Sequence, residues 1–142
     1  MRDRLLPLAA IVTPNVPEAE ALTGQAIHTL DDMRRVARIL RGYGPKAVLL
    51  KGGHMAGPVL HDLLLWDGGE EIFEGPRFDT PHTHGTGCTL ASSIASGVAC
   101  GLGLRDAVAR ARAYVMEAIR TAPGLGHGHG PLNHMHTVKD FP

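Results

Sequence analysis

Residues 82–89, with the sequence HTHGTGCT, carry the strongest structural signal of the chain, because a glycine-rich loop runs directly into a helical pattern. From Cys88 to Leu102 apolar residues recur at helical spacing with small residues between them, which predicts a core helix buried on several sides. The first N–H groups of a helix lack partners within it, and glycine lets such amides approach an anion closely. The sequence therefore predicts an anion-binding loop at the start of a core helix.

The residues before this loop predict a strand, helix, strand unit. Residues 9–12 and 47–50 are short apolar runs stopped by turn residues, as in parallel strands covered on both faces. Between them we expect a short helix over residues 17–22 and a longer one that begins at Thr29, where Asp32 completes a capping box. In such units ligands bind beyond the carboxyl ends of the strands, and Asn15 and Lys51 fall at these ends.

Further patterns complete an α/β domain. Residues 59–66 and 70–73, separated by Asp-Gly-Gly, predict a hairpin and hence a mixed sheet. Residues 104–119 form an apolar stripe opposite arginines, which predicts an amphipathic helix. At 142 residues, and roughly 150 per domain, we expect one domain or a piece of one.

Composition excludes several classes of protein. Fourteen basic and fourteen acidic residues cancel, so no uniform positive field draws the chain to nucleic acid or anionic lipid. The long uncharged stretch over residues 80–104 is too rich in Gly, Ser, Thr and His to span a membrane. Two cysteines, Cys88 and Cys100, make no disulfide framework, and the expected location is the reducing cytoplasm. We therefore expect no nucleic-acid or membrane partner.

Cys88 is the candidate reactive group, since the dipole of the helix it starts would favour its thiolate. A phosphate-binding Walker loop needs Gly-Lys followed by Ser or Thr, which this chain lacks. A cysteine phosphatase needs an arginine six residues after its cysteine, and Ile94 occupies that position. A nucleophile elbow also fails, because Thr89 and Leu90 follow the cysteine. Phosphoryl transfer with Cys88 as base stays open beside the alternative of a small buried cysteine in a glycine turn.

Four blocks in order, at residues 13–20, 48–54, 84–90 and 128–134, resemble the hydroxymethylpyrimidine/phosphomethylpyrimidine kinases of the ribokinase-like superfamily. The resemblance implies an α/β fold with a partial, mostly parallel sheet flanked by helices. It also implies two ATP-dependent phosphorylations in thiamine biosynthesis, of 4-amino-5-hydroxymethyl-2-methylpyrimidine and then of its monophosphate. The segment 128–134 is then a loop close to the nucleotide.

The same resemblance assigns roles to individual residues. Gly85, Thr86, Gly87 and the amide of Cys88 would form the hole for developing phosphoryl charge, with the Cys88 thiolate as general base. These are the groups that a transferring phosphoryl requires.

A second set of residues concerns the nucleotide and its metal. By the resemblance, Asn15 and Glu18 match an Asn-x-x-Glu motif that helps to hold the Mg²⁺ and phosphates of ATP, through water. Lys51 would reach the nucleotide phosphates; its alternative is a solvated lysine that closes a strand.

The resemblance also implies that residues 1–142 are a single half-domain on the nucleotide side, without the amino-terminal half that supplies much of the pyrimidine pocket. An exposed sheet edge would follow, favouring a homo-oligomer or pairing with the missing half. Two alternatives are an inactive nucleotide-binding fragment and a histidine-rich metal-binding protein, the latter suggested by four histidines between residues 127 and 136.

Overall fold

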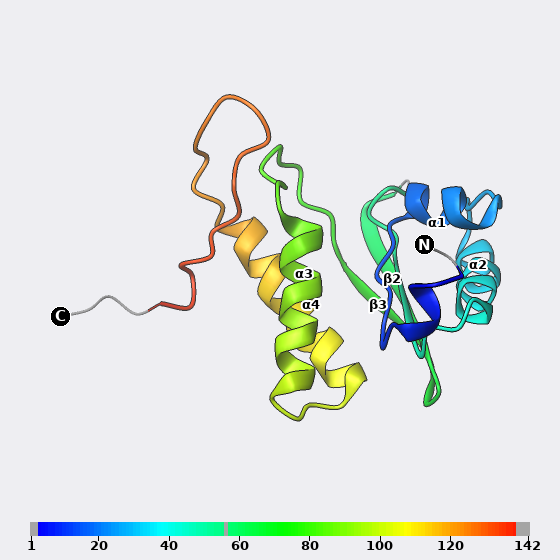
Figure 1. Ribbon diagram of the computed structural model, residues 1–142. Coiled ribbons are helices and arrows are strands. Elements are labelled where there is room, and N and C mark those ends of the chain that lie inside the picture. Colours follow the sequence, from blue (N-terminus) through cyan, green and yellow to red (C-terminus); the bar gives the residue numbers. More distant parts are fainter. Residues whose placement is uncertain (1–2, 56, 139–142) are drawn as a thin grey trace. The chain divides into compact units, whose positions relative to one another are not determined.

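The computed structural model describes residues 3–55 and 57–138, which fall into two compact units, Met1–Arg77 and Phe78–Pro142. The expected single half-domain over residues 1–142 stays a prediction. The first unit holds a 3₁₀ turn, two helices and three strands, and the second holds two helices (Figure 1). In chain order these are η1 Leu6–Leu8, α1 Val16–Thr23, α2 Leu30–Gly42, β1 Val48–Lys51, β2 Val59–Trp66, β3 Gly69–Pro76, α3 Thr86–Ala99 and α4 Leu104–Arg120.

The sheet of the first unit is mixed. Its three named strands are antiparallel in the order β1-β2-β3, so the predicted hairpin is confirmed. The predicted strand over residues 9–12 is not a continuous strand: within it Val12 forms an isolated parallel bridge with Val48 of β1, and beyond it Asn15 forms another with Lys51. The Val12 N–H donates to the Ala47 carbonyl at 3.0 Å. The α/β prediction is confirmed, but the parallel share of the sheet is smaller than expected, because the chain leaves β1 through a hairpin and not through a second crossover.

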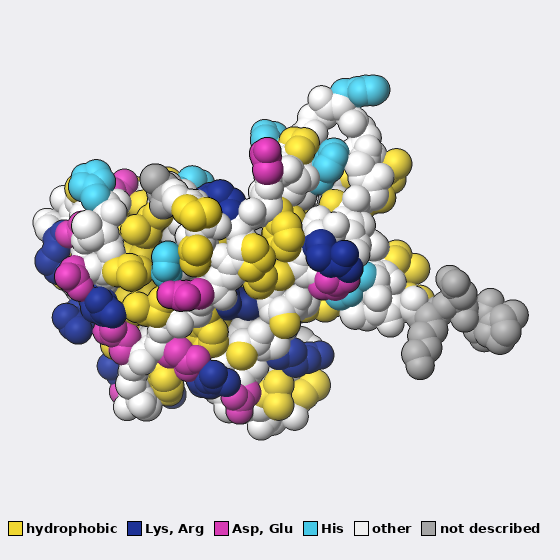
Figure 2. Space-filling view, turned by 180° about the vertical axis from the view of Figure 1, so that it is seen from behind, with side chains coloured by type: hydrophobic (Ala, Val, Ile, Leu, Met, Phe, Trp, Pro, Cys, Tyr) yellow, Lys and Arg dark blue, Asp and Glu magenta, His cyan; other side chains and the backbone are white. Residues whose placement is uncertain are grey.

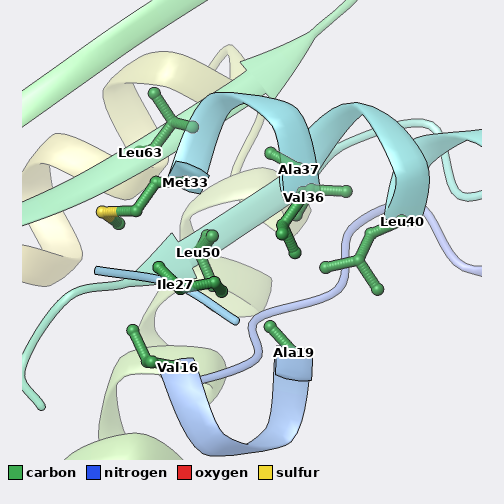
Figure 3. Packing of buried hydrophobic residues seen from close by; sticks show 10 residues of the cluster. Val16, Ala19, Ile27, Met33, Val36, Ala37, Leu40, Leu50 and Leu63 are labelled. Carbon is green, nitrogen blue, oxygen red and sulfur yellow. The ribbon is translucent and has the colours of Figure 1, made fainter. Parts of the chain in front are cut away.

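Helix α2 forms as its sequence predicts. The Thr29 hydroxyl accepts from the Asp32 amide at 3.1 Å, and the Asp32 carboxylate accepts from the Thr29 amide at 3.1 Å. Four apolar side chains of α2, Met33, Val36, Ala37 and Leu40, are fully buried and pack with α1 and with one face of the sheet (Figure 3). The cluster comprises Val16, Ala19, Ile27, Met33, Val36, Ala37, Leu40, Val48, Leu50 and Leu63.

The outer face of α2 carries charges of both signs. Arg34 pairs with Asp31 at 2.8 Å and with Glu70 of β3 at 2.7 Å. The Arg35 guanidinium, helped by the His28 amide, holds the pKa of the Asp32 carboxyl well below its usual range. On the face that Figure 2 shows, acidic and basic side chains lie interspersed.

The second unit is a pair of packed helices. A Cβ at Gly97 of α3 would lie 3.1 Å from the Ala107 Cβ of α4, so glycine permits the close approach of the two helices. The prediction that α3 is buried on several sides is wrong: Leu90, Ile94 and Gly97 are its buried residues, and Val98 is 44% exposed. One neighbouring helix covers one face, and the small residues elsewhere on α3 remain open. Among the described residues, no helix has the length and apolarity to cross a bilayer.

Candidate active site

Three predicted site residues lie in the first unit, at the end of β1. Asn15 faces Lys51 across a parallel bridge, and the Lys51 amide donates to the Pro14 carbonyl at 2.9 Å. Two neighbouring parallel segments therefore end side by side, which is where α/β sheets bind ligands.

Asn15 and Glu18 form the capping box of α1. The Asn15 Oδ1 accepts from the Glu18 amide at 2.8 Å, and the Glu18 Oε2 accepts from the Asn15 amide at 2.8 Å. The pair thus has a structural role in starting the helix, which the resemblance alone did not indicate. Glu18 is exposed, and in the described part of the chain its Oε1 has no hydrogen-bond partner, so one carboxylate oxygen is open to a ligand.

The turn after Lys51 has a fixed geometry. The Gly52 amide donates to the Asp62 Oδ1 at 3.0 Å, and a Cβ on Gly52 would lie 2.1 Å from the His61 carbonyl oxygen. No larger residue fits there without a backbone shift. The half-buried Lys51 side chain forms no ion pair with any residue that the structure describes, so its ammonium is available to an anion.

Four predicted residues lie together in the second unit, at the start of α3. Gly85 is the N-cap, with φ 85° in the left-handed region that favours glycine. The Thr86 amide and hydroxyl both donate to the Thr83 carbonyl, at 3.3 and 2.7 Å. The amides of Gly87 and Cys88 have no acceptor within residues 3–55 and 57–138. Two free amides and no acidic residue in the first turn give this end of α3 the character of an anion site.

Cys88 opens onto a pocket of about 420 Å³ within the second unit. Its thiol is free and the residue is exposed, so the alternative of a buried structural cysteine is wrong. The pocket is lined by Cys88, Thr89, Ser92, Ser93, Ser96, Tyr114 and His134.

The hydroxyl-bearing wall of this pocket was missed by the sequence analysis. Ser92 and Ser96 follow Cys88 at intervals of four, so they share its face of α3. That spacing was the available signal, but it was interpreted only as small residues of a core helix. Tyr114 and His134 come from α4 and the tail, with ring centroids 6.5 Å apart, and no local pattern links them.

The tail lies beside the glycine loop. The His84 amide donates to the Gly130 carbonyl at 3.3 Å, and His84 forms a parallel bridge with Pro131. The Asn133 amide donates to the Ala118 carbonyl at 3.0 Å, which fastens the tail to α4. The described residues contain no group of three or more His, Cys, Asp or Glu arranged to hold a metal ion, so the histidines offer no ligand set there.

The family model described as phosphomethylpyrimidine kinase matches residues 1–133. The chain belongs to the phosphomethylpyrimidine kinase family. A hydroxymethylpyrimidine/phosphomethylpyrimidine kinase of Synechococcus elongatus is 45% identical over 139 residues, which are 97% of this chain and 53% of that protein.

Another relative is the thiamine biosynthesis bifunctional protein ThiED of Geobacter sulfurreducens, 49% identical over 99% of this chain and 29% of its own length. The chain therefore spans about half the length, or less, of these members of the kinase family.

Solved structures agree with the family assignment. A Staphylococcus aureus pyridoxal kinase in complex with AMP-PCP matches with a TM-score of 0.89 and 32% identity, over 94% of this chain and 50% of that one. A phosphomethylpyrimidine kinase from Clostridium difficile matches with a TM-score of 0.70 and 41% identity, over 83% of this chain and 46% of that one. The predicted ribokinase-like α/β fold is confirmed.

Proposed function

We propose that this chain is the nucleotide-side part of an ATP-dependent kinase of thiamine biosynthesis, acting in the cytoplasm on 4-amino-5-hydroxymethyl-2-methylpyrimidine and on its monophosphate. The observation that carries the proposal is the start of α3, where two free amides adjoin the exposed thiol of Cys88. Family membership supplies the reaction class, since the relatives are named as kinases.

The first turn of α3 would bind the migrating phosphoryl group. Gly85 and Gly87 have no side chains, so phosphoryl oxygens can approach the amides of Gly87 and Cys88. The hydrogen bonds from Thr86 to the Thr83 carbonyl hold the turn. Amides fixed in a helix end need no reorganisation as charge develops, which favours the transition state over the bound substrate. Lys51 would add a cation for the nucleotide phosphates.

Cys88 would act as general base. Its thiolate takes the proton from the hydroxymethyl group, the freed oxygen attacks the terminal phosphorus of ATP, and the bond from that phosphorus to the bridging oxygen breaks to release ADP. For the second phosphorylation the acceptor is a phosphate oxygen of the monophosphate.

The residues present fit a magnesium ion held through water. Mg²⁺ prefers oxygen ligands and keeps several waters, and the open Oε1 of Glu18 is such an oxygen at the carboxyl end of the sheet. Asn15 would orient Glu18 through the capping box. Bound magnesium would neutralise charge on the nucleotide phosphates.

The test compares the exposed Cys88 near the start of α3 with the exposed Cys100 just after its end. Cys88→Ala removes the proposed base, and Cys100→Ala, at the C-cap of the same helix, is the matched control. ATP-dependent phosphorylation of the hydroxymethylpyrimidine is measured with the chain alone and with the separately expressed amino-terminal half of the Synechococcus relative. We expect Cys88→Ala to lower kcat by about 10²- to 10⁴-fold, with nucleotide affinity retained. Equal losses in kcat and affinity, or the same loss in the control, would contradict the general-base role.

A second candidate is a nucleotide-binding fragment that turns over only with a partner, either a second copy or an amino-terminal half. The open edge of the parallel segment favours it: in the described part of the chain, the backbone groups of Ile11 and Thr13 have no hydrogen-bond partner, while those of Val12 pair with β1. Unpaired strand edges recruit further strands. Nucleotide binding by the chain alone in calorimetry, with turnover only after the amino-terminal half is added, would favour this candidate over a chain that is active by itself.

A further inference from the structure

The loop that follows Lys51 is held by one arginine from elsewhere in the chain. Residues 52–58 connect β1 to β2 and include glycines at 52, 53 and 57, a composition typical of a pliable loop. Arg77, directly after β3, donates from Nη1 to the Gly53 carbonyl at 2.8 Å and from Nε to the Gly57 carbonyl at 2.8 Å. Its Nη2 donates to the Met55 carbonyl.

The three contacts use the particular shape of the guanidinium. Its N–H groups point outward in a rigid planar fork, and the carbonyls of residues 53, 55 and 57 converge on that fork. Hydrogen bonds from a charged donor are stronger than those from a neutral one. The Arg77 amide adds a bond to the Pro58 carbonyl at 3.1 Å. A lysine ammonium is a compact point charge and cannot reproduce this spread of donors.

The clamped loop continues directly from a proposed nucleotide contact. Lys51 ends β1, and the Gly52 amide that follows it is held by Asp62. The bonds from Arg77 hold the carbonyls of residues 53, 55 and 57, so both sides of the turn are anchored. Loss of the clamp would remove three hydrogen bonds from the residues that follow Gly52 and would loosen the turn that leads on from Lys51.

We propose that Arg77 is a positioning residue for the kinase reaction: it holds the described loop residues 53, 55 and 57 in place and thereby orders the turn next to Lys51, the proposed contact of the nucleotide phosphates. The inference rests on the proposed function, because the nucleotide role of Lys51 belongs to it. Arg77 acts through the loop backbone and itself touches no reacting atom.

The test uses Arg77→Ala and Arg77→Lys, with Arg34→Ala as the matched control. Arg34 is an arginine of the same unit that also makes two charged contacts, but to the carboxylates of Asp31 and Glu70 and not to the loop. Hydrogen exchange of the peptide covering residues 52–58 reports loop order, and calorimetry with ADP and Mg²⁺ reports affinity.

We expect both Arg77 variants to exchange faster in this loop and to bind ADP about tenfold more weakly, with the Arg34 variant unchanged in both. Millimolar methylguanidinium should restore order and affinity to Arg77→Ala, a rescue that general destabilisation would not show. Unchanged exchange, unchanged affinity or failure of the rescue would overturn the role of Arg77. If the unmodified chain binds no ADP, the proposed function fails first, and the positioning role fails with it.

Discussion

Gly52→Ala tests whether the turn after Lys51 is fixed by close backbone contact. A Cβ at residue 52 would stand 2.1 Å from the His61 carbonyl oxygen, whereas real Cβ contacts essentially never fall under 3.0 Å. The difference of 0.9 Å (3.0 − 2.1) must be met by moving backbone, since the obstructing atom belongs to β2. Gly53→Ala is the control, because its added methyl would meet nothing within 4 Å.

The cost follows from two effects of that movement. Forcing an extra carbon into a packed backbone contact costs about 1–3 kcal/mol. The shift also weakens the bond from the Gly52 amide to the Asp62 carboxylate, and a hydrogen bond to a charged group contributes about 1.5–3 kcal/mol. We expect Gly52→Ala to lower the free energy of unfolding of the first unit by about 3 kcal/mol, and Gly53→Ala by less than about 1 kcal/mol.

The assay is urea unfolding followed by tryptophan fluorescence. Trp66 is the single tryptophan of the chain and lies in β2, so its signal reports the first unit. The midpoint should fall for Gly52→Ala with an unchanged slope. If the two glycine variants unfold at the same urea concentration, the close contact with His61 does not constrain the turn and the reasoning fails.

Two further predictions concern the helices. Because Arg35 holds the pKa of Asp32 low, the ionised carboxyl stabilises the fold fully above the ordinary carboxyl pKa of about 4, and this contribution is lost as pH falls toward the lower folded value. The difference in urea midpoint between the unmodified chain and Asp32→Asn should therefore narrow between about pH 5 and pH 2; a constant difference would refute the charge effect. Gly97→Val places side-chain atoms against Ala107 and should destabilise the second unit by about 1–3 kcal/mol. The measurement is the loss of hydrogen-exchange protection in α4. Ser96→Val, on the exposed face of α3, is the control, and equal protection in the two variants would contradict the close helix packing.

Local sequence determined the elements whose causes are local. The capping box of Thr29 and Asp32 lies within four residues, so the start of α2 could be predicted from the sequence, and its apolar face is buried as expected. The glycine loop before Cys88 was predicted for the same reason, because Gly85 sets the left-handed cap by itself.

Features that depend on distant partners were missed or misjudged. Helical spacing on α3 indicated burial, but spacing does not say how many neighbours cover a helix, and Val98 is exposed. The clamp of Arg77 on Gly53 joins residues 24 apart in sequence through backbone carbonyls, which carry no residue-specific signal. The Tyr114 and His134 walls of the pocket depend likewise on how the tail returns to α4.

The capping box of α1 has a bearing on how its motif is interpreted. Asn15 and Glu18 each use one oxygen to begin the helix, and in the proposed site Glu18 also faces the hydrated magnesium while Asn15 orients Glu18. Selection for a capped helix and selection for metal binding would therefore both retain Asn at position 15 and Glu at position 18. Finding Asn-x-x-Glu retained in other sequences cannot separate the two pressures, whereas Glu18→Gln can, because the amide oxygen still accepts the cap bond while the negative charge is gone.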